Sequence, residues 1–438
     1  MKNHSYKDYS YTEAIEFFRN LPHFNPPKEP GKKTSDLFSL DAELALLEKL
    51  DNPHESLKYI HVAGTNGKGS TSAFIASILK EANIKVGLFT SPFLYAYNEM
   101  FRVNGEQISD VEFAGLFSRV KPAYEQLALA GIYPSEYEIL TVMAFMYFKE
   151  LGCELVVLEV SMGGSLDTTN VIPAPWVSVI TPISYDHMTI LGNTLTEIAT
   201  EKAGIIKPGT IVVSAPQEEE VKQVLNETCV SLGVDVYYLP ESTSKDRDLS
   251  GQYFQMPGYE KPFFTKLLGT YQIRNAGLAI LAIEQLKQYG INIPEQAIYD
   301  GVSTTNWFGR FTLLKDNPPV IIDGGHNRQG ALVLAESLKA YFPDKKITFI
   351  LGILKDKEVD LMLDAILPLA KEVYTLEVPT ARTMNPLELS ELINKRGVKS
   401  QPIEGLNELE SITKVSEVVC IAGSLYINGY GIDFQSMV

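Results

Sequence analysis

Short apolar runs alternate with longer amphipathic segments along most of the chain. Apolar residues in Thr71–Ala82 recur at i, i+3 and i+4, which predicts a helix. Unbroken runs rich in β-branched residues are typical of parallel strands covered on both faces, so we expect an α/β fold with right-handed crossovers. The strands predicted for the first half are Tyr59–Val62, Val86–Phe89, Leu155–Val160, Val177–Thr181 and Ile211–Ser214.

The alternation begins again after about residue 305, in the polar segment GVSTTNW. We therefore predict two α/β domains, residues 1–305 with a mostly parallel sheet and residues 306–438 with a doubly wound sheet of their own. Polar stretches at Pro22–Thr34 and Pro240–Gly251 are predicted to be surface loops. The elements expected in the second domain are strands at Val320–Ile322, Ile347–Leu351, Val373–Leu376 and Val418–Ile421 and helices at Ala331–Ala340 and Glu358–Leu369.

Composition supports a large globular protein. The 438 residues are 45% hydrophobic and 21% charged, which excludes a disordered chain, a collagen-like chain and a disulfide-stapled mini-protein. The formal net charge of −16 argues against general binding to nucleic acid or anionic membranes, which need basic surface. Any anionic substrate must therefore be held by local cations, backbone N–H groups or a metal ion.

Cysteine usage and hydropathy indicate a cytoplasmic protein. Cys153, Cys229 and Cys420 are few and widely spaced, as expected for small core residues in a reducing compartment. The N-terminal segment has no apolar core of a secretory signal, and the apolar stretch Ile139–Phe148 is too short to span a bilayer. We expect a cytoplasmic monomer without nucleic-acid or membrane partners.

The segment YIHVAGTNGKGSTSAF carries the strongest chemical signal. A strand ends at Val62, a turn containing Gly64, Gly67 and Gly69 follows, and Ser70 and Thr71 open a helix. Such a turn directs backbone N–H groups and the positive helix end at an anion, with Lys68 placed for the phosphates of a nucleotide. The spacing departs from the full Walker A pattern, and a plain tight turn is the alternative.

Two further segments place polar residues at the ends of strands of the same predicted sheet, and a third segment contains Lys202. Glu159 ends one strand, and Asp186 and His187 follow another, so these side chains share an edge where a metal could bind. The alternatives are a solvated strand-end residue for Glu159 and a packed or surface histidine for His187. Asp167 and Asn170 alone would be turn residues more often than ligands, and Lys202 in EKAGIIKPG alone would pass as a surface lysine.

The second half opens with a further cluster. Arg310 lies in WFGRF, and Asp323 ends a strand before Gly324, Gly325 and His326. An arginine and a carboxylate at a second sheet edge suit nucleotide contacts, while a strand-end turn without a ligand is the alternative.

Taken together, these segments resemble the folylpolyglutamate synthase/dihydrofolate synthase family of ATP-dependent amide ligases, which is related to the Mur ligases. The matching segments occur in family order and span about residues 35–430; they are HVAGTNGKGS, LFTSPF, SEYEILTVMAF, LEVSMGG, LDTTN, YDHMTILG, EKAGIIKPG, GTYQIRNAGLAI, WFGR, IIDGGHN, ILGILKDKE and IAGSLY. The resemblance implies an N-terminal P-loop-type ATPase domain followed by a C-terminal Rossmann-like α/β domain.

The resemblance also implies the reaction and its cofactors. ATP phosphorylates a carboxylate of the pterin substrate, and the amino group of L-glutamate attacks the acyl phosphate to give an amide, ADP and phosphate. Mg²⁺, bound at two sites, neutralises charge on the transferring group. Family members act on reduced folates, on dihydropteroate or on both, in folate biosynthesis and one-carbon metabolism.

Site residues follow from the matched positions. The resemblance makes Lys68, His187 and Lys202 catalytic, with Lys202 carried as a carbamate. Ser91, Glu159, His187 and Lys202 match the metal positions. The implied ATP-binding residues are Gly64, Thr65, Asn66, Gly67, Lys68, Gly69, Ser70, Asn275, Arg310, Asp323 and His326, so that ATP would bridge the two halves. The implied folate- or pterin-binding residues are Phe93, Ser135, Glu136, Tyr137, Glu138, Leu166, Asp167 and Thr168.

Departures from the family pattern leave the substrate open. Phe93, Ser165, Tyr271 and Arg328 replace the residues that many members carry in these motifs, and the first two lie beside the expected pterin site. The main prediction is glutamate addition to folates, either as the sole reaction or together with glutamate addition to dihydropteroate. A ligase that acts on a different carboxylic acid, and a non-catalytic nucleotide-binding regulator, are the alternatives.

Overall fold

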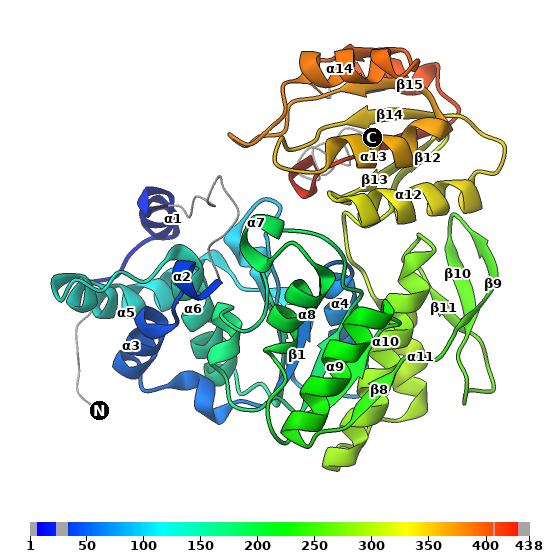
Figure 1. Ribbon diagram of the computed structural model, residues 1–438. Helices are drawn as coiled ribbons and strands as arrows, with labels where there is room; N and C mark the ends of the chain where they lie inside the picture. The colour runs from blue at the N-terminus through cyan, green and yellow to red at the C-terminus, as the bar shows by residue number, and fades with distance from the viewer. Residues whose placement is uncertain (1–6, 23–33, 406–407, 428–438) are drawn as a thin grey trace. The chain divides into compact units, whose positions relative to one another are not determined.

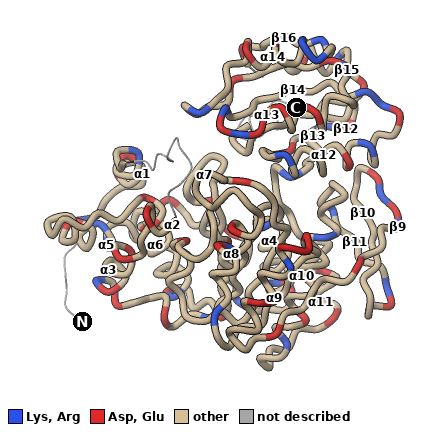
Figure 2. The backbone as a smooth tube through the Cα atoms, viewed as in Figure 1, with Lys and Arg blue, Asp and Glu red and all other residues tan. Residues whose placement is uncertain are grey.

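The computed structural model describes residues 7–22, 34–405 and 408–427, and it divides into two compact units. The first unit runs to Leu239 and takes in Leu278–Gly301. The second comprises Pro240–Gly277 and the chain from Val302 onward. The domain boundary predicted at 305/306 divides the chain by function rather than by compactness, and it stays a prediction. Acidic positions are distributed along the chain in both units (Figure 2).

A largely parallel sheet forms the centre of the first unit, as predicted (Figure 1). Among the described residues the strand order is β4-β3-β2-β5-β1-β6-β7-β8, and the pairs from β2 to β8 are parallel. β3 and β4 form an antiparallel hairpin that was not predicted because its strands are too short to form apolar runs, although Asn104–Gly105 is a strong turn signal. The strands are β1 Tyr59–Ala63, β2 Val86–Phe89, β3 Phe101–Val103, β4 Glu106–Gln107, β5 Leu155–Glu159, β6 Val177–Ile180, β7 Ile211–Ser214 and β8 Val236–Tyr238.

Helices cover both faces of this sheet. α1, α3, α5 and α6 contribute to an aromatic-rich core that includes Phe18, Phe117 and Phe148, whereas α8 and α9 pack in a second core around Ile198 and Leu225. The helices are α1 Tyr11–Asn20, α2 Thr34–Leu37, α3 Asp41–Lys49, α4 Lys68–Glu81, α5 Asp110–Leu129, α6 Glu136–Glu150, α7 Met188–Leu191, α8 Leu195–Ala203, α9 Glu219–Leu232, α10 Tyr271–Leu286 and α11 Glu295–Thr304. The division into units falls within α10 and within α11.

The second unit contains the predicted second α/β sheet. Among the described residues its order is β12-β13-β17-β14-β15-β16, parallel except for the β12–β13 pair. Ile321 packs in the core under α12 and α13, and Val320 and Ile322 pack on the opposite face with α15. The elements are β12 Thr312–Asp316, β13 Pro319–Asp323, α12 Arg328–Tyr341, β14 Ile347–Leu351, α13 Val359–Ile366, β15 Ala370–Thr375, α14 Pro386–Lys395, β16 Ser400–Pro402, α15 Leu409–Lys414 and β17 Val419–Ala422.

The predicted loop Pro240–Gly251 is wrong in part. Its residues Thr243–Asp248 form β9, the edge strand of an antiparallel sheet with β10 Gly251–Gln255 and β11 Phe263–Thr265. Nearly every residue of β9 is exposed and polar, so the strand carries no hydrophobic signal and is held by backbone pairing to β10. For the predicted loop Pro22–Thr34, residues 23–33 lie outside the described residues, and Thr34 opens α2.

Candidate active site

The turn after β1 is a tight connection directly into α4. The helix begins at Lys68, three residues before the predicted start, and Gly67 is its N-cap in a left-handed conformation. Gly64 has φ +144°, and a Cβ there would lie 1.9 Å from Thr181 Oγ1. Only glycine therefore fits at position 64. The early helix start places Gly69 and Ser70 within the first turn, where both are buried.

Neighbouring backbone fixes the shape of this turn. The amides of Thr65 and Asn66 donate to the carbonyl of Pro182 at 3.0 and 3.3 Å. Thr65 Oγ1 accepts from the Ser184 amide and donates to the Ser184 carbonyl, both at 3.0 Å. The segment after β6 therefore braces the turn, a contribution that sequence reasoning missed because the contacts use backbone atoms of Pro182 and Ser184.

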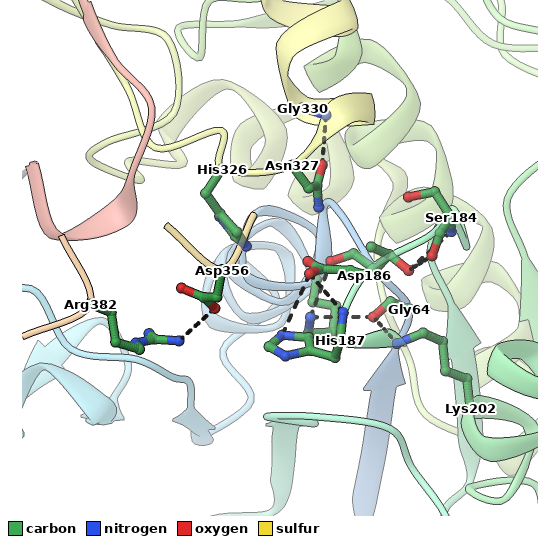
Figure 3. A network of polar contacts seen from close by, with 12 residues as sticks. Gly64, Ser184, Asp186, His187, Lys202, His326, Asn327, Gly330, Asp356 and Arg382 are labelled. Carbon is green, nitrogen blue, oxygen red and sulfur yellow. Dashed lines mark hydrogen bonds and ion pairs between the residues drawn. The ribbon is translucent and has the colours of Figure 1, made fainter. Parts of the chain in front are cut away.

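Two lysines converge on one carbonyl of the turn. Lys68 Nζ donates to the carbonyls of Gly64 and Thr65, each at 3.3 Å. Lys202 Nζ, from α8, donates to the Gly64 carbonyl at 2.8 Å (Figure 3). The structure thus brings together two predicted catalytic residues that are far apart in sequence.

Lys202 is buried, contrary to what its polar segment suggests. The residue is 4% exposed. Burial, followed by the charge of Lys68, lowers its pKa to about 7, against smaller opposing contributions from Asp186, Asp167 and Glu201. A Cβ on Gly164 would lie 2.7 Å from the Glu201 carbonyl, so this glycine lets its loop pack closely against α8. An amine in this state is partly neutral at physiological pH and is therefore nucleophilic toward CO₂.

Ser91 and Glu159 lie together at the predicted sheet edge. The Ser91 amide donates to Glu159 Oε2 at 3.2 Å, and Tyr137 Oη donates to Ser91 Oγ at 3.2 Å. Glu159 is 5% exposed at the end of β5, and burial raises the pKa of Tyr137 well above its ordinary value. A serine hydroxyl and a carboxylate are oxygen donors of the kind that Mg²⁺ prefers.

His187 is more exposed than the other predicted metal residues. It adopts a left-handed conformation (φ 50°) as the N-cap of α7, and its amide donates to Asp186 Oδ1 at 2.9 Å. Its Nε2 lies 3.9 Å from Asp186 Oδ1, and 40% of the imidazole side chain is exposed (Figure 3). Among the described residues, no group of three His, Cys, Asp or Glu side chains is placed to hold a metal ion.

The predicted pterin-binding segment at the start of α6 is a capping box. Ser135 is the N-cap, and its amide donates to Glu138 Oε2 at 2.6 Å. Glu136 accepts a hydrogen bond from Tyr97 Oη, whose ring centroid lies 4.4 Å from that of Phe93. Phe93 packs against the core of the first unit. The segment therefore combines apolar ring surface with carboxylates.

Four donors from the protein itself bind the Asp167 carboxylate. Its Oδ2 accepts from the amides of Ser161 and Met162 at 2.9 and 3.0 Å. Its Oδ1 accepts from the Thr169 amide at 3.0 Å and the Thr169 hydroxyl at 2.5 Å. Leu166 beside it is half-buried. A carboxylate offers about four lone-pair sites, so the protein itself fills Asp167.

His61 of β1 and Thr141 of α6 contact the loop that contains Thr168 and Thr169. His61 Nε2 lies 2.8 Å from Thr169 Oγ1, and burial lowers the pKa of His61 to about 3, so the ring is neutral. Thr168 Oγ1 lies 2.7 Å from Thr141 Oγ1. Sequence reasoning missed His61, although a histidine inside an apolar strand is a signal of a specific polar partner.

In the second unit, Asp323 organises the predicted nucleotide residues. Its Oδ2 accepts from Tyr271 Oη at 2.6 Å and the Phe311 amide at 2.9 Å, and its Oδ1 accepts from the Gly325 amide at 2.7 Å. Burial, followed by the charge of Asp323, raises the pKa of Tyr271 well above its ordinary value. The charge of Arg310 acts on the pKa of Tyr271 in the opposite direction, and Arg310 Nη1 donates to the Gly309 carbonyl at 3.1 Å.

The other two predicted nucleotide residues also have defined partners. Asn275 is 4% exposed and donates from Nδ2 to Gln272 Oε1 at 2.9 Å. His326 Nδ1 lies 3.1 Å from the Gly324 carbonyl, and Asn327 next to it caps α12 by accepting from the Gly330 amide (Figure 3).

Two family models place the chain in the Mur ligase class of ATP-dependent ligases. The family model described as "Mur ligase middle domain" matches residues 62–283, and the model described as "Mur ligase, glutamate ligase domain" matches residues 309–425. The chain is therefore an ATP-dependent amide ligase.

Individual relatives identify the family to which the chain belongs within this class. The dihydrofolate synthase/folylpolyglutamate synthase of Bacillus subtilis is 38% identical over 392 residues, covering 87% of this chain and 91% of the relative. A solved folylpolyglutamate synthase of Mycobacterium tuberculosis, complexed with ADP and AMPPCP, superposes with a TM-score of 0.86 at 28% identity and covers 97% and 98% of the two chains. A solved FPGS–AMPPCP–folate complex superposes with a TM-score of 0.83 at 30% identity, covering 98% of this chain and 100% of that chain. The chain belongs to the folylpolyglutamate synthase/dihydrofolate synthase family.

Proposed function

We propose that this ligase adds L-glutamate to the terminal carboxylate of a reduced folate, using ATP and Mg²⁺. The observation that carries the proposal is the convergence of Lys68 and Lys202 on the Gly64 carbonyl. Two ammonium groups on one carbonyl repel each other unless an anion binds or one group loses its charge. Phosphate binding by Lys68 and carbamylation of Lys202 would each remove that repulsion.

ATP is bound mainly by the glycine turn in this proposal. The Gly64–Ser70 backbone and Lys68 would hold the phosphates, and the positive end of α4 would favour their charge. The residues proposed for the rest of the nucleotide are Asn275, Arg310, Asp323 and His326. The proposed functional halves are residues 1–305, which carry the phosphate turn, and residues 306–438, which carry most of the remaining nucleotide contacts.

Ser91 and Glu159 fit a magnesium site. Both present oxygen atoms, and the hydrogen bond between them sets their relative position. Mg²⁺ commonly takes one or two protein oxygens and completes its shell with water and phosphate oxygens, so a larger preformed cage is not required. His187 and carbamylated Lys202 are the proposed ligands of a second ion. The bound metal would neutralise charge on the transferring phosphoryl group.

The chemistry proceeds in two substitutions. A substrate carboxylate oxygen attacks the γ-phosphorus, ADP leaves, and an acyl phosphate results. The amine of glutamate then attacks the acyl carbon, the new C–N bond forms, and inorganic phosphate leaves with the amine proton passing to a base or water. Lys68 would stabilise the phosphoryl charge in the first step. Phe93, residues 135–138 and residues 166–168 would position the pterin.

Dihydropteroate is a second candidate substrate because the Bacillus subtilis relative carries both activities in its name. The test offers dihydropteroate and tetrahydrofolate separately with ATP, Mg²⁺ and glutamate, and identifies the products by mass. We expect a product one glutamyl residue heavier and one phosphate released per amide formed. Phosphate release with neither acid, but with an unrelated carboxylic acid, would contradict the proposal.

We further propose that the enzyme acts as a cytoplasmic monomer. Cys153, Cys229 and Cys420 are all free, buried thiols, as is usual in a reducing compartment. No helix among the described residues is long and apolar enough to cross a membrane. Light scattering at the concentration used for activity should give the mass of one 48.7 kDa chain.

A further inference from the structure

Glu43 is a buried carboxyl group in α3 that none of the assigned functions uses. The residue is 0% exposed, and among the described residues neither carboxyl oxygen has a hydrogen-bond partner. It lies on the same helix as Leu46 and Leu47, which belong to the core. Burying a polar group without a hydrogen bond is costly, so such a group is kept only where something repays the cost.

The surroundings of Glu43 are acidic. Burial raises its pKa well above the ordinary range, and the charges of Glu138 and Asp167 raise it further. α3 contacts α6, which carries Glu138 in its first turn (Figure 1). The two carboxylates whose charges act on Glu43 belong to the segments 135–138 and 166–168 that we propose for the pterin.

The two carboxyl groups in this region, Asp167 and Glu43, differ in how many of their acceptor positions are already occupied by protein donors. Asp167 already receives four protein donors, from Ser161, Met162 and Thr169. Glu43 receives none among the described residues. A ligand that brings polar hydrogens into this region would therefore bind to Glu43 rather than to Asp167.

The ligand class follows from the same geometry. The two unpartnered oxygens of Glu43 can accept hydrogen bonds from an organic partner that carries N–H groups. The pyrimidinone edge of a pterin presents a ring N–H beside an exocyclic amino group, with a carbonyl and a ring nitrogen on either side. This edge makes two parallel hydrogen bonds to a carboxyl group, whether the group is ionised or neutral.

We infer that Glu43 is a substrate-recognition residue that binds the pyrimidinone edge of the pterin ring. The inference rests on the proposed function, because it takes the pterin acid as substrate. It also explains why a carboxyl group lies in the core of this unit: its unused acceptors are reserved for the substrate.

The experiment measures binding and turnover separately. Dissociation constants of dihydropteroate and tetrahydrofolate are measured by calorimetry with AMPPCP and Mg²⁺ present, for the full-length protein. Glu43→Met removes both hydrogen bonds, and Glu43→Gln keeps at least one with nearly the same shape. Glu48→Gln, on the exposed side of the same helix, is the matched control.

We expect Glu43→Met to weaken pterin binding by at least roughly tenfold and Glu43→Gln by a smaller factor, since each lost hydrogen bond leaves a ligand donor unpaired. The Glu48→Gln control and the affinity for AMPPCP should not change. Without pterin, Glu43→Met should melt at a higher temperature than the wild type, because an unpartnered buried carboxyl is gone. A carboxyl kept for the fold would instead lower the melting temperature.

Pterin affinities within twofold of the wild type in both Glu43 variants would overturn the inference, even if the enzyme ligates glutamate normally. A wild type that binds pterin through Glu43 but forms no amide would overturn the proposed function and support the inference. A wild type that binds neither pterin acid would overturn both.

Discussion

Two strand-end turns in this enzyme look alike in sequence and differ in how they use charge. The turn after β1 and the turn after β13 both follow a buried strand, contain glycines and lead into a long helix. In the first, Lys68 and Lys202 donate to the backbone carbonyls of the turn. In the second, the Asp323 carboxylate accepts from Tyr271 and two amides.

The lysine ammonium groups of the first turn are available to a ligand, whereas the Asp323 carboxylate of the second turn is used to hold the fold. An ammonium group on a carbonyl can exchange that contact for a phosphate oxygen at little cost, because charge-assisted hydrogen bonds are the stronger ones. A buried carboxylate that is already bonded to three donors mainly holds those donors in place. Changes at the first turn should therefore reduce turnover, and changes at the second should reduce stability or nucleotide affinity.

The largest effect is expected for Lys68→Ala. One preorganised contact to developing charge contributes about 3 kcal/mol, so kcat should fall by roughly two to three orders of magnitude with the fold intact. The measurement is steady-state phosphate release with circular dichroism as a check on folding. Lys80→Ala, at an exposed position of the same helix, is the control. Near-normal turnover in well-folded Lys68→Ala would show that the first turn is not the phosphate site.

A somewhat smaller loss is expected for Lys202→Ala, about a hundredfold, with partial rescue by short carboxylic acids that replace the carbamate. The pKa of Lys202 is lowered to about 7, so the neutral amine, which alone reacts with CO₂, increases as the pH rises through 7. Wild-type activity at fixed CO₂ should therefore rise roughly tenfold between pH 6 and pH 8. Full activity of Lys202→Ala without added acid would reject the carbamate.

The parallel strands and the glycine turn could be predicted because each has a local signal. Tyr59–Ala63 and Leu155–Glu159 are largely apolar runs of strand length, and Gly64 and Gly67 mark a turn because both have positive φ, which favours glycine. The edge strand β9 could not, because its residues are polar and its order comes from pairing with β10. Local patterns report burial, and β9 has almost none.

The site was less predictable than the fold because its key properties arise from distant contacts. Nothing in EKAGIIKPG shows that Lys202 is buried; the close approach of the Gly164 loop and the Gly64 carbonyl creates that burial. Glu43 did have a signal, since it occupies the core-facing side of α3 with Leu46 and Leu47. A carboxylate at such a position is rare enough to be noted from sequence alone.

At the second turn, Asp323→Ala should lower stability by about 2 kcal/mol, since it leaves Tyr271 Oη and two amides without their acceptor. Urea denaturation measures this loss. Asp323→Asn keeps one acceptor oxygen and should lose less. If Asp323→Ala is as stable as the wild type, its carboxylate is not holding the turn, and the contrast between the two turns disappears.

The smallest effect is expected for Arg310→Ala, and it sharpens the comparison within the second turn itself. Arg310 is half-buried, and its Nη1 donates to the Gly309 carbonyl at 3.1 Å, so like Lys68 it can exchange a carbonyl for a nucleotide oxygen. We expect the KM for ATP to rise about tenfold, equivalent to about 1.4 kcal/mol, with kcat and stability little changed. Initial rates at varied ATP measure this. A lower kcat with an unchanged KM would instead place Arg310 among the groups that act only in the transition state, alongside Lys68.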